Sequence, residues 1–301
     1  MTEPTIRNFT ASDGYKIHFR HWQSSSPRGI VIALHGIQSH SGWYKASSHA
    51  MAEAGFDVYF ADRRGSGWNG FQRGHAAHGM RLINDVRALA ALARDEHRAD
   101  ALGGSSLPVV LMGISWGGKT AAATVSLFPS EFQGLALLYP GLEPRLRPNA
   151  WQRFQLKLAR RFEITKTDIP IPLRSPELFT DTPKWKQFIA EDPLALHAVT
   201  SSFLNAGKDL DNIVASHSTE IRCPVLLMLA GRDKIIDNAK TRTRVASFMT
   251  NDFTSICYPV ACHTLEFEPD RDAIFSDLTE WLRMRCLRTR PSRIADGNDC
   301  R

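Results

Sequence analysis

Short runs of apolar residues alternate with stretches of helical periodicity along most of the chain. A short apolar run is typical of a strand buried on both faces, whereas apolar positions three and four residues apart are typical of a helix. The runs that predict strands are 4–10, 15–22, 29–34, 57–62, 107–113, 134–140, 224–231 and 253–258. Helical spacing is found over 42–54, 79–98, 116–128, 238–249 and 270–287. Asp13-Gly14 predicts a hairpin turn between the first two strands. The alternation as a whole predicts an α/β fold, with a mostly parallel central sheet and helices on both faces.

The alternation stops over residues 141–216, which contain many prolines and no apolar run of the same quality. We interpret 141–216 as a cap, or lid, inserted between two strands of a single core. The core then consists of residues 1–140 and 217–287. Residues 288–301 follow the last predicted helix, and we expect them to form a mobile basic tail.

Composition agrees with a globular protein, and the charge is unevenly distributed. The 301 residues are 43% hydrophobic and 23% charged, with a formal net charge of +6. Residues 145–166 hold seven Lys and Arg against one Glu, and residues 283–301 hold six Arg against two Asp. The rest of the chain is therefore slightly acidic. No recognised binding motif accompanies the basic segments, so we do not expect nucleic acid as a partner.

The cysteine pattern and the apolar runs bear on the compartment. The five cysteines include no CxxC pair, so neither a disulfide framework nor a zinc ribbon is indicated. The first residues lack the apolar region of a signal peptide, and no apolar run is long enough for a spanning helix. We therefore expect a cytoplasmic protein.

A glycine-rich motif at residues 113–120 has two possible interpretations. Gly113-Ile114-Ser115-Trp116-Gly117 matches the G-x-S-x-G nucleophile elbow, in which a serine stands on a tight turn between a strand and a helix. The same stretch, ending in Gly118-Lys119-Thr120, also matches a phosphate-binding loop, which needs the same flanking elements. The motif alone does not separate a hydrolase from a nucleotide-binding protein.

Residues far from the motif favour the elbow. His35-Gly36 follows one predicted strand, Asp233 follows a second and His263 follows a third. The order Ser, Asp, His is that of α/β-hydrolases, and the phosphate loop leaves His35-Gly36 and His263 unexplained. Asp237, in the same loop as Asp233, is an alternative acid. For Lys119 we expect a solvated or capping position in the first helical turn.

At these motifs the chain resembles the serine α/β-hydrolases, and within them the monoacylglycerol lipase and lysophospholipase-like group. The motifs that carry the resemblance are LHGIQSHSGWY (34–44), DRRGSGWN (62–69), GISWGG (113–118), GRDKIID (231–237) and CHTLEFE (262–268). They span most of residues 30–285. The sequence departs from the pattern at Ile37-Gln38, where many such lipases have smaller residues, and at Trp68.

The predicted reaction is hydrolysis of a carboxylic ester, such as a monoacylglycerol or lysophospholipid, through an acyl-enzyme intermediate. Ser115 is the predicted nucleophile, His263 the general base and Asp233 its partner. The backbone N–H groups of Ile37 and Trp116 are expected to form the oxyanion hole. No metal or cofactor is implied.

Several alternatives stay open at this point. An acyltransferase, thioesterase, amidase or C–C hydrolase uses the same triad. Proteins of another class are a P-loop nucleotide-binding protein and a non-catalytic binder with this fold.

The candidates for substrate binding are His35, Trp68, Trp151 and Phe154, of which His35 is expected mainly to support its loop. Trp151 and Phe154 begin a predicted amphipathic helix whose other face is basic, through Arg153, Lys157, Arg160 and Arg161. This basic face is either exposed to solvent or in contact with an anionic lipid surface. The expected partner is a small ester substrate, and the sequence leaves the oligomeric state open.

Overall fold

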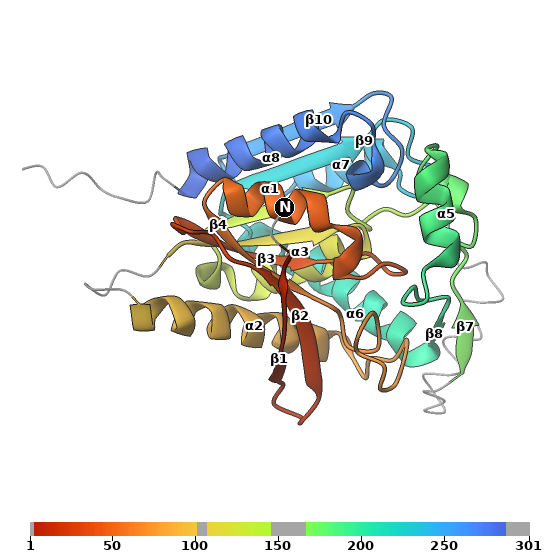
Figure 1. Ribbon diagram of the computed structural model, residues 1–301, viewed down its shortest axis with the longest axis horizontal. Coiled ribbons are helices and arrows are strands. Elements are labelled where there is room, and N and C mark those ends of the chain that lie inside the picture. The colour runs from red at the N-terminus through yellow and green to blue at the C-terminus, as the bar shows by residue number, and fades with distance from the viewer. Residues whose placement is uncertain (1–2, 101–106, 146–166, 287–301) are drawn as a thin grey trace, which may run out of the picture.

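The computed structural model describes residues 3–100, 107–145 and 167–286, and it centres on a single eight-stranded sheet (Figure 1). The strands are β1 (Thr5–Thr10), β2 (Lys16–Trp22), β3 (Gly29–Leu34), β4 (Phe56–Ala61), β5 (Val109–Ile114), β6 (Gly134–Leu138), β9 (Val225–Ala230) and β10 (Phe253–Tyr258). Their order across the sheet is β1-β2-β4-β3-β5-β6-β9-β10.

Most neighbouring strands run parallel, and the exceptions lie at one edge. β1 pairs with β2, and β2 with β4, in antiparallel register, whereas every pair from β4 to β10 is parallel. The β1–β2 turn contains Gly14 at a φ of 81°, a conformation that glycine adopts without strain. The central strands β3, β5 and β9 are buried at every position, as a sheet covered on both faces requires. The predicted fold class is confirmed.

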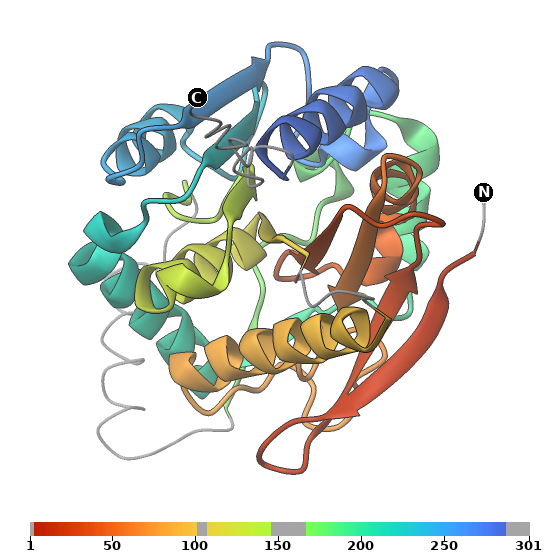
Figure 2. The same cartoon turned by 90° about the vertical axis from the view of Figure 1, so that its left-hand side faces the viewer.

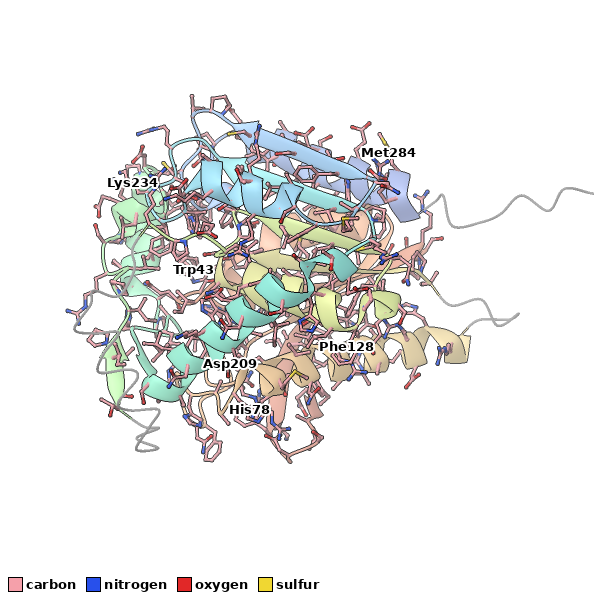
Figure 3. All side chains as sticks on the ribbon, turned by 180° about the vertical axis from the view of Figure 1, so that it is seen from behind. Trp43, His78, Phe128, Asp209, Lys234 and Met284 are labelled. Atoms are coloured by element: carbon pink, nitrogen blue, oxygen red, sulfur yellow. The ribbon has the colours of Figure 1, made fainter. Side chains whose placement is uncertain are left out.

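Helices cover both faces of the sheet. Helix α1 (Lys45–Glu53) contacts α8 (Arg271–Cys286) on one face, and α2 (Gly79–Asp100), α3 (Trp116–Leu127) and α6 (Ser201–His217) contact one another on the other face (Figures 1 and 2). Helix α7 (Asn238–Ala246) packs on β9. The view from behind in Figure 3 shows α6 and α3 in front of the sheet.

The predicted helix over 42–54 is divided. A 3₁₀ turn over Ser41–Trp43 precedes α1, because the His40 side chain accepts from the Gly42 N–H and caps that turn separately. Helix α1 then ends just before Gly55, whose φ is 96°. None of the helices within the described residues is long and apolar enough to span a membrane.

The described residues between β6 and β9 form short elements and one long helix. They are β7 (Asp168–Pro170), a 3₁₀ turn over Pro176–Leu178, α5 (Pro183–Glu191), β8 (Ala198–Thr200), α6 and a 3₁₀ turn over Ser218–Glu220. The strands β7 and β8 pair only with each other, antiparallel. Helix α5 stacks Trp185 on Phe267 of the core at 4.6 Å between ring centroids. The proposed division into a core of 1–140 and 217–287 and a cap over 141–216 stays a prediction, and the expected tail over 288–301 lies outside the described residues.

The carboxyl ends of β3, β5, β9 and β10 lie at the same end of the sheet, because these strands are parallel. Loops that follow such strands meet there, and this is where ligands bind in open α/β sheets. The loops after these four strands contain Ile37, Ser115, Asp233 and His263, and Trp116 begins the helix that follows β5.

Candidate active site

Ser115 occupies a strained turn between β5 and α3. Its φ of 50° and ψ of −121° lie outside the regions that most L-residues adopt, and such strain is concentrated at functional sites. The turn is closely packed on both sides. A Cβ at Gly113 would lie 2.6 Å from the Gly118 Cα, and one at Gly117 would lie 2.4 Å from the Leu34 carbonyl oxygen. The two motif glycines are therefore required by the close approach of backbone.

The three residues of the predicted triad form a continuous chain of hydrogen bonds. His263 Nε2 lies 3.0 Å from Ser115 Oγ, and His263 Nδ1 lies 2.7 Å from Asp233 Oδ2. All three side chains are buried. The backbone N–H groups of Ile235 and Ile236 donate to Asp233 Oδ1, at 2.7 and 2.9 Å, and fix the carboxylate. Both carboxylate oxygens are thus used, one for the histidine and one for its own loop.

Asp237, the alternative acid, has a different function in the structure. Its side chain accepts from the Lys240 N–H and caps the N-terminus of α7. Capping lowers its pKa, through hydrogen bonds from the Lys240 backbone and side chain. The geometry therefore places Asp233, and not Asp237, against His263.

Aromatic rings enclose the His263 imidazole. The Tyr139 ring centroid lies 4.7 Å from that of the imidazole, and the Phe179 centroid lies 5.9 Å from it, both edge-on. Phe179 belongs to the segment between β6 and β9, and its carbonyl accepts from the Thr264 N–H beside the histidine. The imidazole is therefore held in a water-poor setting, where its bonds to Ser115 and Asp233 are stronger than in solvent.

The loop after β3 passes directly over Ser115. A Cβ built on Gly36 would lie 3.7 Å from Ser115 Oγ, so the Gly36 backbone faces the hydroxyl. Trp116 is the first residue of α3, where N–H groups lack partners within the helix and favour negative charge. Gly36, which precedes the predicted donor Ile37, and Trp116, the other predicted donor, thus lie beside Ser115 on different segments.

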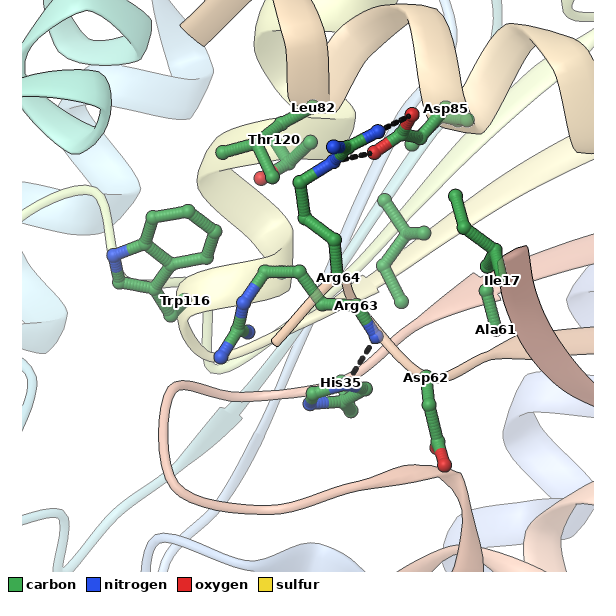
Figure 4. Close-up of a pocket in the computed structure, with 13 residues that line it drawn as sticks. Ile17, His35, Ala61, Asp62, Arg63, Arg64, Leu82, Asp85, Trp116 and Thr120 are labelled. Atoms are coloured by element: carbon green, nitrogen blue, oxygen red, sulfur yellow. Dashed lines mark hydrogen bonds and ion pairs between the residues drawn. The ribbon is translucent and has the colours of Figure 1, made fainter. Parts of the chain in front are cut away.

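His35 stabilises this loop. Its Nε2 accepts from the Arg63 N–H at 2.8 Å, which Figure 4 shows as a dashed line, and its Nδ1 lies 2.7 Å from the Gly36 carbonyl oxygen. Burial lowers the pKa of His35 well below its usual range, so the ring is neutral and carries its proton on Nδ1. With both nitrogens bound to the chain, His35 supports the loop and has no nitrogen free for a substrate.

The other candidates for substrate binding lie elsewhere. Trp68 is 49% exposed, and it lines a surface hollow with Tyr15 and Phe71 and not the cavity beside Trp116. Trp151 and Phe154 lie outside the described residues, as do Arg153, Lys157, Arg160 and Arg161 of the predicted basic face.

Lys119 corrects one expectation from the sequence. It is buried, not solvated, and its Nζ lies 2.8 Å from Asp211 Oδ1 on α6. A phosphate loop needs this lysine free to reach a phosphate, whereas here it links α3 to α6. The start of α3 also packs closely against the backbone at the end of β3, since a Cβ at Gly117 would lie 2.4 Å from the Leu34 carbonyl oxygen. This leaves no room for a phosphate there. Lys119 therefore gives no support to a nucleotide site.

Two functional features escaped the sequence analysis. Arg63 donates to the carbonyl oxygens of Gly36 and Ile37, and Asp192 accepts from Trp43 Nε1 and contacts His40 Nε2, so both hold the loop over Ser115. The signal for Arg63 was an arginine in a glycine-rich loop directly after a strand. For Asp192 no local signal exists. Among the described residues, no group of three or more His, Cys, Asp or Glu side chains is arranged so that it could hold a metal ion.

The sheet order and the strained serine after β5 define the chain as an α/β-hydrolase. Residues 25–270 match the model of the family described as serine aminopeptidase, S33, and the chain belongs to that family.

Individual relatives agree with this assignment. A monoacylglycerol lipase of Mycolicibacterium smegmatis is 25% identical over 91% of this chain and 95% of its own. The solved structure of a soluble variant of Saccharomyces cerevisiae monoglyceride lipase superimposes with a TM-score of 0.81 at 18% identity, over 95% of this chain and 96% of that one. A carboxyl esterase of Bacillus coagulans gives 0.80 at 18% identity, over 95% and 100%. The resemblance to this group, inferred from the motifs, is confirmed, and the relatives support an ester hydrolase.

Proposed function

We propose that this protein hydrolyses carboxylic esters of the monoacylglycerol type through an acyl-enzyme intermediate on Ser115. The observation that carries the proposal is the buried chain of hydrogen bonds from Ser115 through His263 to Asp233. The small-molecule ester as substrate follows from the family relatives, and the glyceryl monoester as the particular substrate is part of the proposal.

In the acylation step, Ser115 Oγ attacks the ester carbonyl carbon and its proton moves to His263 Nε2. The carbonyl oxygen becomes an oxyanion that accepts from the N–H groups of Ile37 and Trp116. Asp233 holds Nδ1 of the imidazole and stabilises its protonated form. The imidazolium then gives its proton to the leaving alcohol, and the C–O bond of the ester breaks.

Deacylation repeats these steps with water as the nucleophile. His263 takes a proton from water while the hydroxide oxygen bonds to the acyl carbon, and the same donors hold the second oxyanion. Ser115 leaves with the proton from His263, and the carboxylic acid is released. The reaction needs only the ester and water.

The substrate class is supported by the relatives' names, which include two monoacylglycerol or monoglyceride lipases and a carboxyl esterase. An acyltransferase, thioesterase, amidase or C–C hydrolase uses the same triad, and the family description itself includes an aminopeptidase. These activities differ in the bond cleaved or the acceptor, so a direct substrate comparison separates them.

The decisive experiment combines labelling with turnover. A fluorophosphonate probe should label the wild-type protein at Ser115, and a mass-spectrometric map of the adduct checks the position. Ser115→Ala should not react, and His263→Ala should react much more slowly. Ser126 is a buried serine on α3, the helix that follows Ser115, so Ser126→Ala is the matched control and should label normally.

Turnover measurements then identify the type of bond that the protein cleaves. Glyceryl monoesters of increasing chain length should be hydrolysed, with much slower release of p-nitroaniline from aminoacyl anilides. Labelling at Ser115 with preferential anilide cleavage would replace the esterase proposal by an amidase. Absence of labelling would contradict the proposal of a serine hydrolase.

A contact between the basic face of residues 153–161 and anionic lipid is a separate proposal, supported by the sequence alone. Co-sedimentation with phosphatidylserine vesicles should exceed that with phosphatidylcholine vesicles and should weaken with salt. Charge reversal at Arg153, Lys157, Arg160 and Arg161 should abolish the difference. Equal binding to both kinds of vesicle would contradict the proposal.

A further inference from the structure

Arg63 lies beside the proposed oxyanion hole and contacts both of its halves. Its Nη1 donates to the Gly36 carbonyl oxygen at 3.0 Å, and its Nη2 donates to that of Ile37 at 2.9 Å. The guanidinium carbon also lies 4.9 Å from the centroid of the Trp116 ring. One side chain therefore joins the loop that presents the Ile37 N–H to the residue that presents the other N–H. Figure 4 shows Arg63 between His35 and Trp116.

The first of these hydrogen bonds acts on the peptide unit that forms the oxyanion hole. The Gly36 carbonyl and the Ile37 N–H belong to the same peptide group. The described chain has no cis peptide bonds, and in a trans peptide the C=O and N–H point in opposite directions. Fixing the Gly36 oxygen, which Arg63 and His35 Nδ1 both contact, therefore fixes the direction of the Ile37 N–H.

The charge on Arg63 is not neutralised in the way that charged side chains usually are. Within the described residues Arg63 makes no ion pair, and its Nε is buried without a hydrogen-bond partner. Its guanidinium lies between two aromatic rings, because the Phe203 centroid on α6 is also 4.9 Å away. Burial lowers the pKa of Arg63 to about 9, which leaves it protonated at neutral pH. Arg63 is thus a half-buried cation whose guanidinium contacts carbonyl oxygens and rings, and it polarises those carbonyls.

The neighbouring arginine shows the ordinary arrangement. Arg64 Nε and Nη2 each lie 2.6 Å from the Asp85 carboxylate, as the dashed lines in Figure 4 show, and Nη1 lies 3.0 Å from Asp13. Within the described residues, Arg64 makes no hydrogen bond or ion pair with the loop over Ser115. Arg63 and Arg64 are adjacent in sequence, yet carboxylates hold Arg64, which is buried, whereas the loop over Ser115 holds Arg63, which is half-buried.

We propose that Arg63 is a positioning residue that orients the Gly36–Ile37 peptide and strengthens its N–H as a donor to the oxyanion. Hydrogen bonding at the carbonyl draws electrons from the amide nitrogen, so the N–H becomes a better donor in the transition state. The inference rests on the proposed function, because it needs an oxyanion at Ser115. It assigns Arg63 no contact with the substrate.

The test compares Arg63→Gln and Arg63→Lys with the matched control Arg64→Gln. With a neutral p-nitrophenyl ester, Arg63→Gln should lower kcat by about 10- to 100-fold and leave KM within about twofold, because the effect is confined to the transition state. Affinity for a trifluoromethyl ketone, which forms an oxyanion adduct, should fall by a similar factor. Arg63→Lys should recover only part of the activity, since an ammonium lacks the planar fork that reaches both carbonyls.

A readout without substrate makes the inference independent of turnover. Amide hydrogen exchange over residues 35–40 should accelerate in Arg63→Gln and not in Arg64→Gln. The control removes the arginine that pairs with the half-buried Asp85, so it should unfold at a lower temperature but keep the wild-type kcat and inhibitor affinity.

Three results would overturn the inference. The first is unchanged kcat, inhibitor affinity and exchange in Arg63→Gln. The second is an equal loss of kcat in Arg64→Gln, which would show only general destabilisation. The third is a rise in KM confined to esters that carry a carboxylate, which would make Arg63 a substrate-binding residue. If the wild-type protein reacts with no fluorophosphonate, the proposed function fails, and hydrogen exchange alone still decides whether Arg63 holds the loop.

Discussion

The two sides of the proposed site are built in different ways. On one side, the turn at Ser115 is fixed by its own sequence, since Gly113 and Gly117 allow strand, helix and neighbouring backbone to approach closely. On the other side, the loop after β3 is held by side chains from distant segments. Arg63 binds its carbonyls, and Asp192 contacts His40 and Trp43 from beyond α5.

This difference determines what a change at each side does. The serine turn tolerates no added atom, so changes there affect folding and chemistry together. The loop is over-determined by several contacts, so single changes there should weaken catalysis and leave the fold intact. Two such contacts also come from the segment between β6 and β9, because Leu196 N donates to the Gln38 carbonyl and Asp192 contacts His40. The loop is thereby coupled to the region predicted to cover the site.

The largest expected effect concerns the hydrogen bonds that join Ser115, His263 and Asp233. Asp233→Asn should lower kcat by about 10⁴-fold, because the amide favours the wrong imidazole tautomer while preserving shape. The matched control is Asp237→Asn in the same loop, which keeps the helix cap and loses only the charge that pairs with Lys240. Its kcat and its unfolding free energy should both stay near those of the wild type. Steady-state hydrolysis of a p-nitrophenyl ester measures both, and comparable losses of kcat would refute the assignment of Asp233.

The next effect tests the packing of the serine turn. In Gly117→Ala the new methyl group would lie 2.4 and 2.7 Å from the carbonyl oxygens of Leu34 and His35, which are backbone atoms. Either β3 or α3 must shift, so we expect a loss of about 3 kcal/mol in unfolding free energy and a severe loss of activity. A Cβ at Gly70 meets no atom within 4 Å, so Gly70→Ala is the control. Equal denaturation midpoints for the two variants would show that this turn is not closely constrained.

Glu266 connects the end of the loop to the segment that follows His263. Its Oε1 accepts from the backbone N–H of Ala46 and Ser47, at 2.8 and 3.2 Å, at the start of α1. Burial raises the pKa of Glu266 from 4.5 to about 7. Between these values the folded protein binds more protons than the unfolded one, so stability is full below pH 4.5 and falls as the pH rises towards 7.

Replacing the titrating group should remove this pH dependence. Glu266→Gln keeps an acceptor oxygen for α1, and it should abolish a decline in unfolding free energy of about 2 kcal/mol between pH 5 and pH 8. Urea denaturation at several pH values measures this decline. Exposed Glu280 on α8 provides the control, and Glu280→Gln should decline as the wild type does. A wild-type protein whose stability rises over this interval by the same amount would contradict the role of Glu266.

The sequence predicts best what neighbouring residues determine. The predicted strands 29–34 and 253–258 coincide with β3, which is buried at every position, and with β10, which lies at the edge of the sheet and is partly exposed. The G-x-S-x-G turn could likewise be predicted, since its glycines and serine are adjacent. Asp233 and His263 could be located by their order after successive strands.

The same approach fails where a partner lies far away in sequence. Lys119 was expected at a helix surface, but α6 covers it and supplies Asp211 from 92 positions further along the chain. Helix α5 was not predicted, because its apolar side meets the aromatic rings of Trp43 and Phe267 and not a sheet. Arg63 belongs to the motif at 62–69, yet its proposed role depends on Gly36, Trp116 and Phe203. These three residues come from three separate segments. No local sequence pattern indicates such long-range contacts.

Gly36→Ala gives the smallest expected effect on stability and compares the two sides most directly. The added methyl group would lie 3.1 Å from Ser39 Oγ, 3.4 Å from Ser115 Cβ and 3.7 Å from Ser115 Oγ. Ser39 Oγ is the end of a side chain and moves at little cost, so the fold should accept the change with a shift of only a few degrees in Tm. The methyl group nevertheless occupies space beside the nucleophile, where the tetrahedral carbon must form. We therefore expect kcat, and the rate of fluorophosphonate labelling, to fall together by about 10- to 100-fold. A small change in Tm together with a large fall in rate would show that Gly36→Ala affects catalysis and not folding. Gly117→Ala should affect both. If Gly36→Ala reacts at the wild-type rate, the loop does not border the reacting carbon, and the oxyanion must be held elsewhere than at the Ile37 N–H.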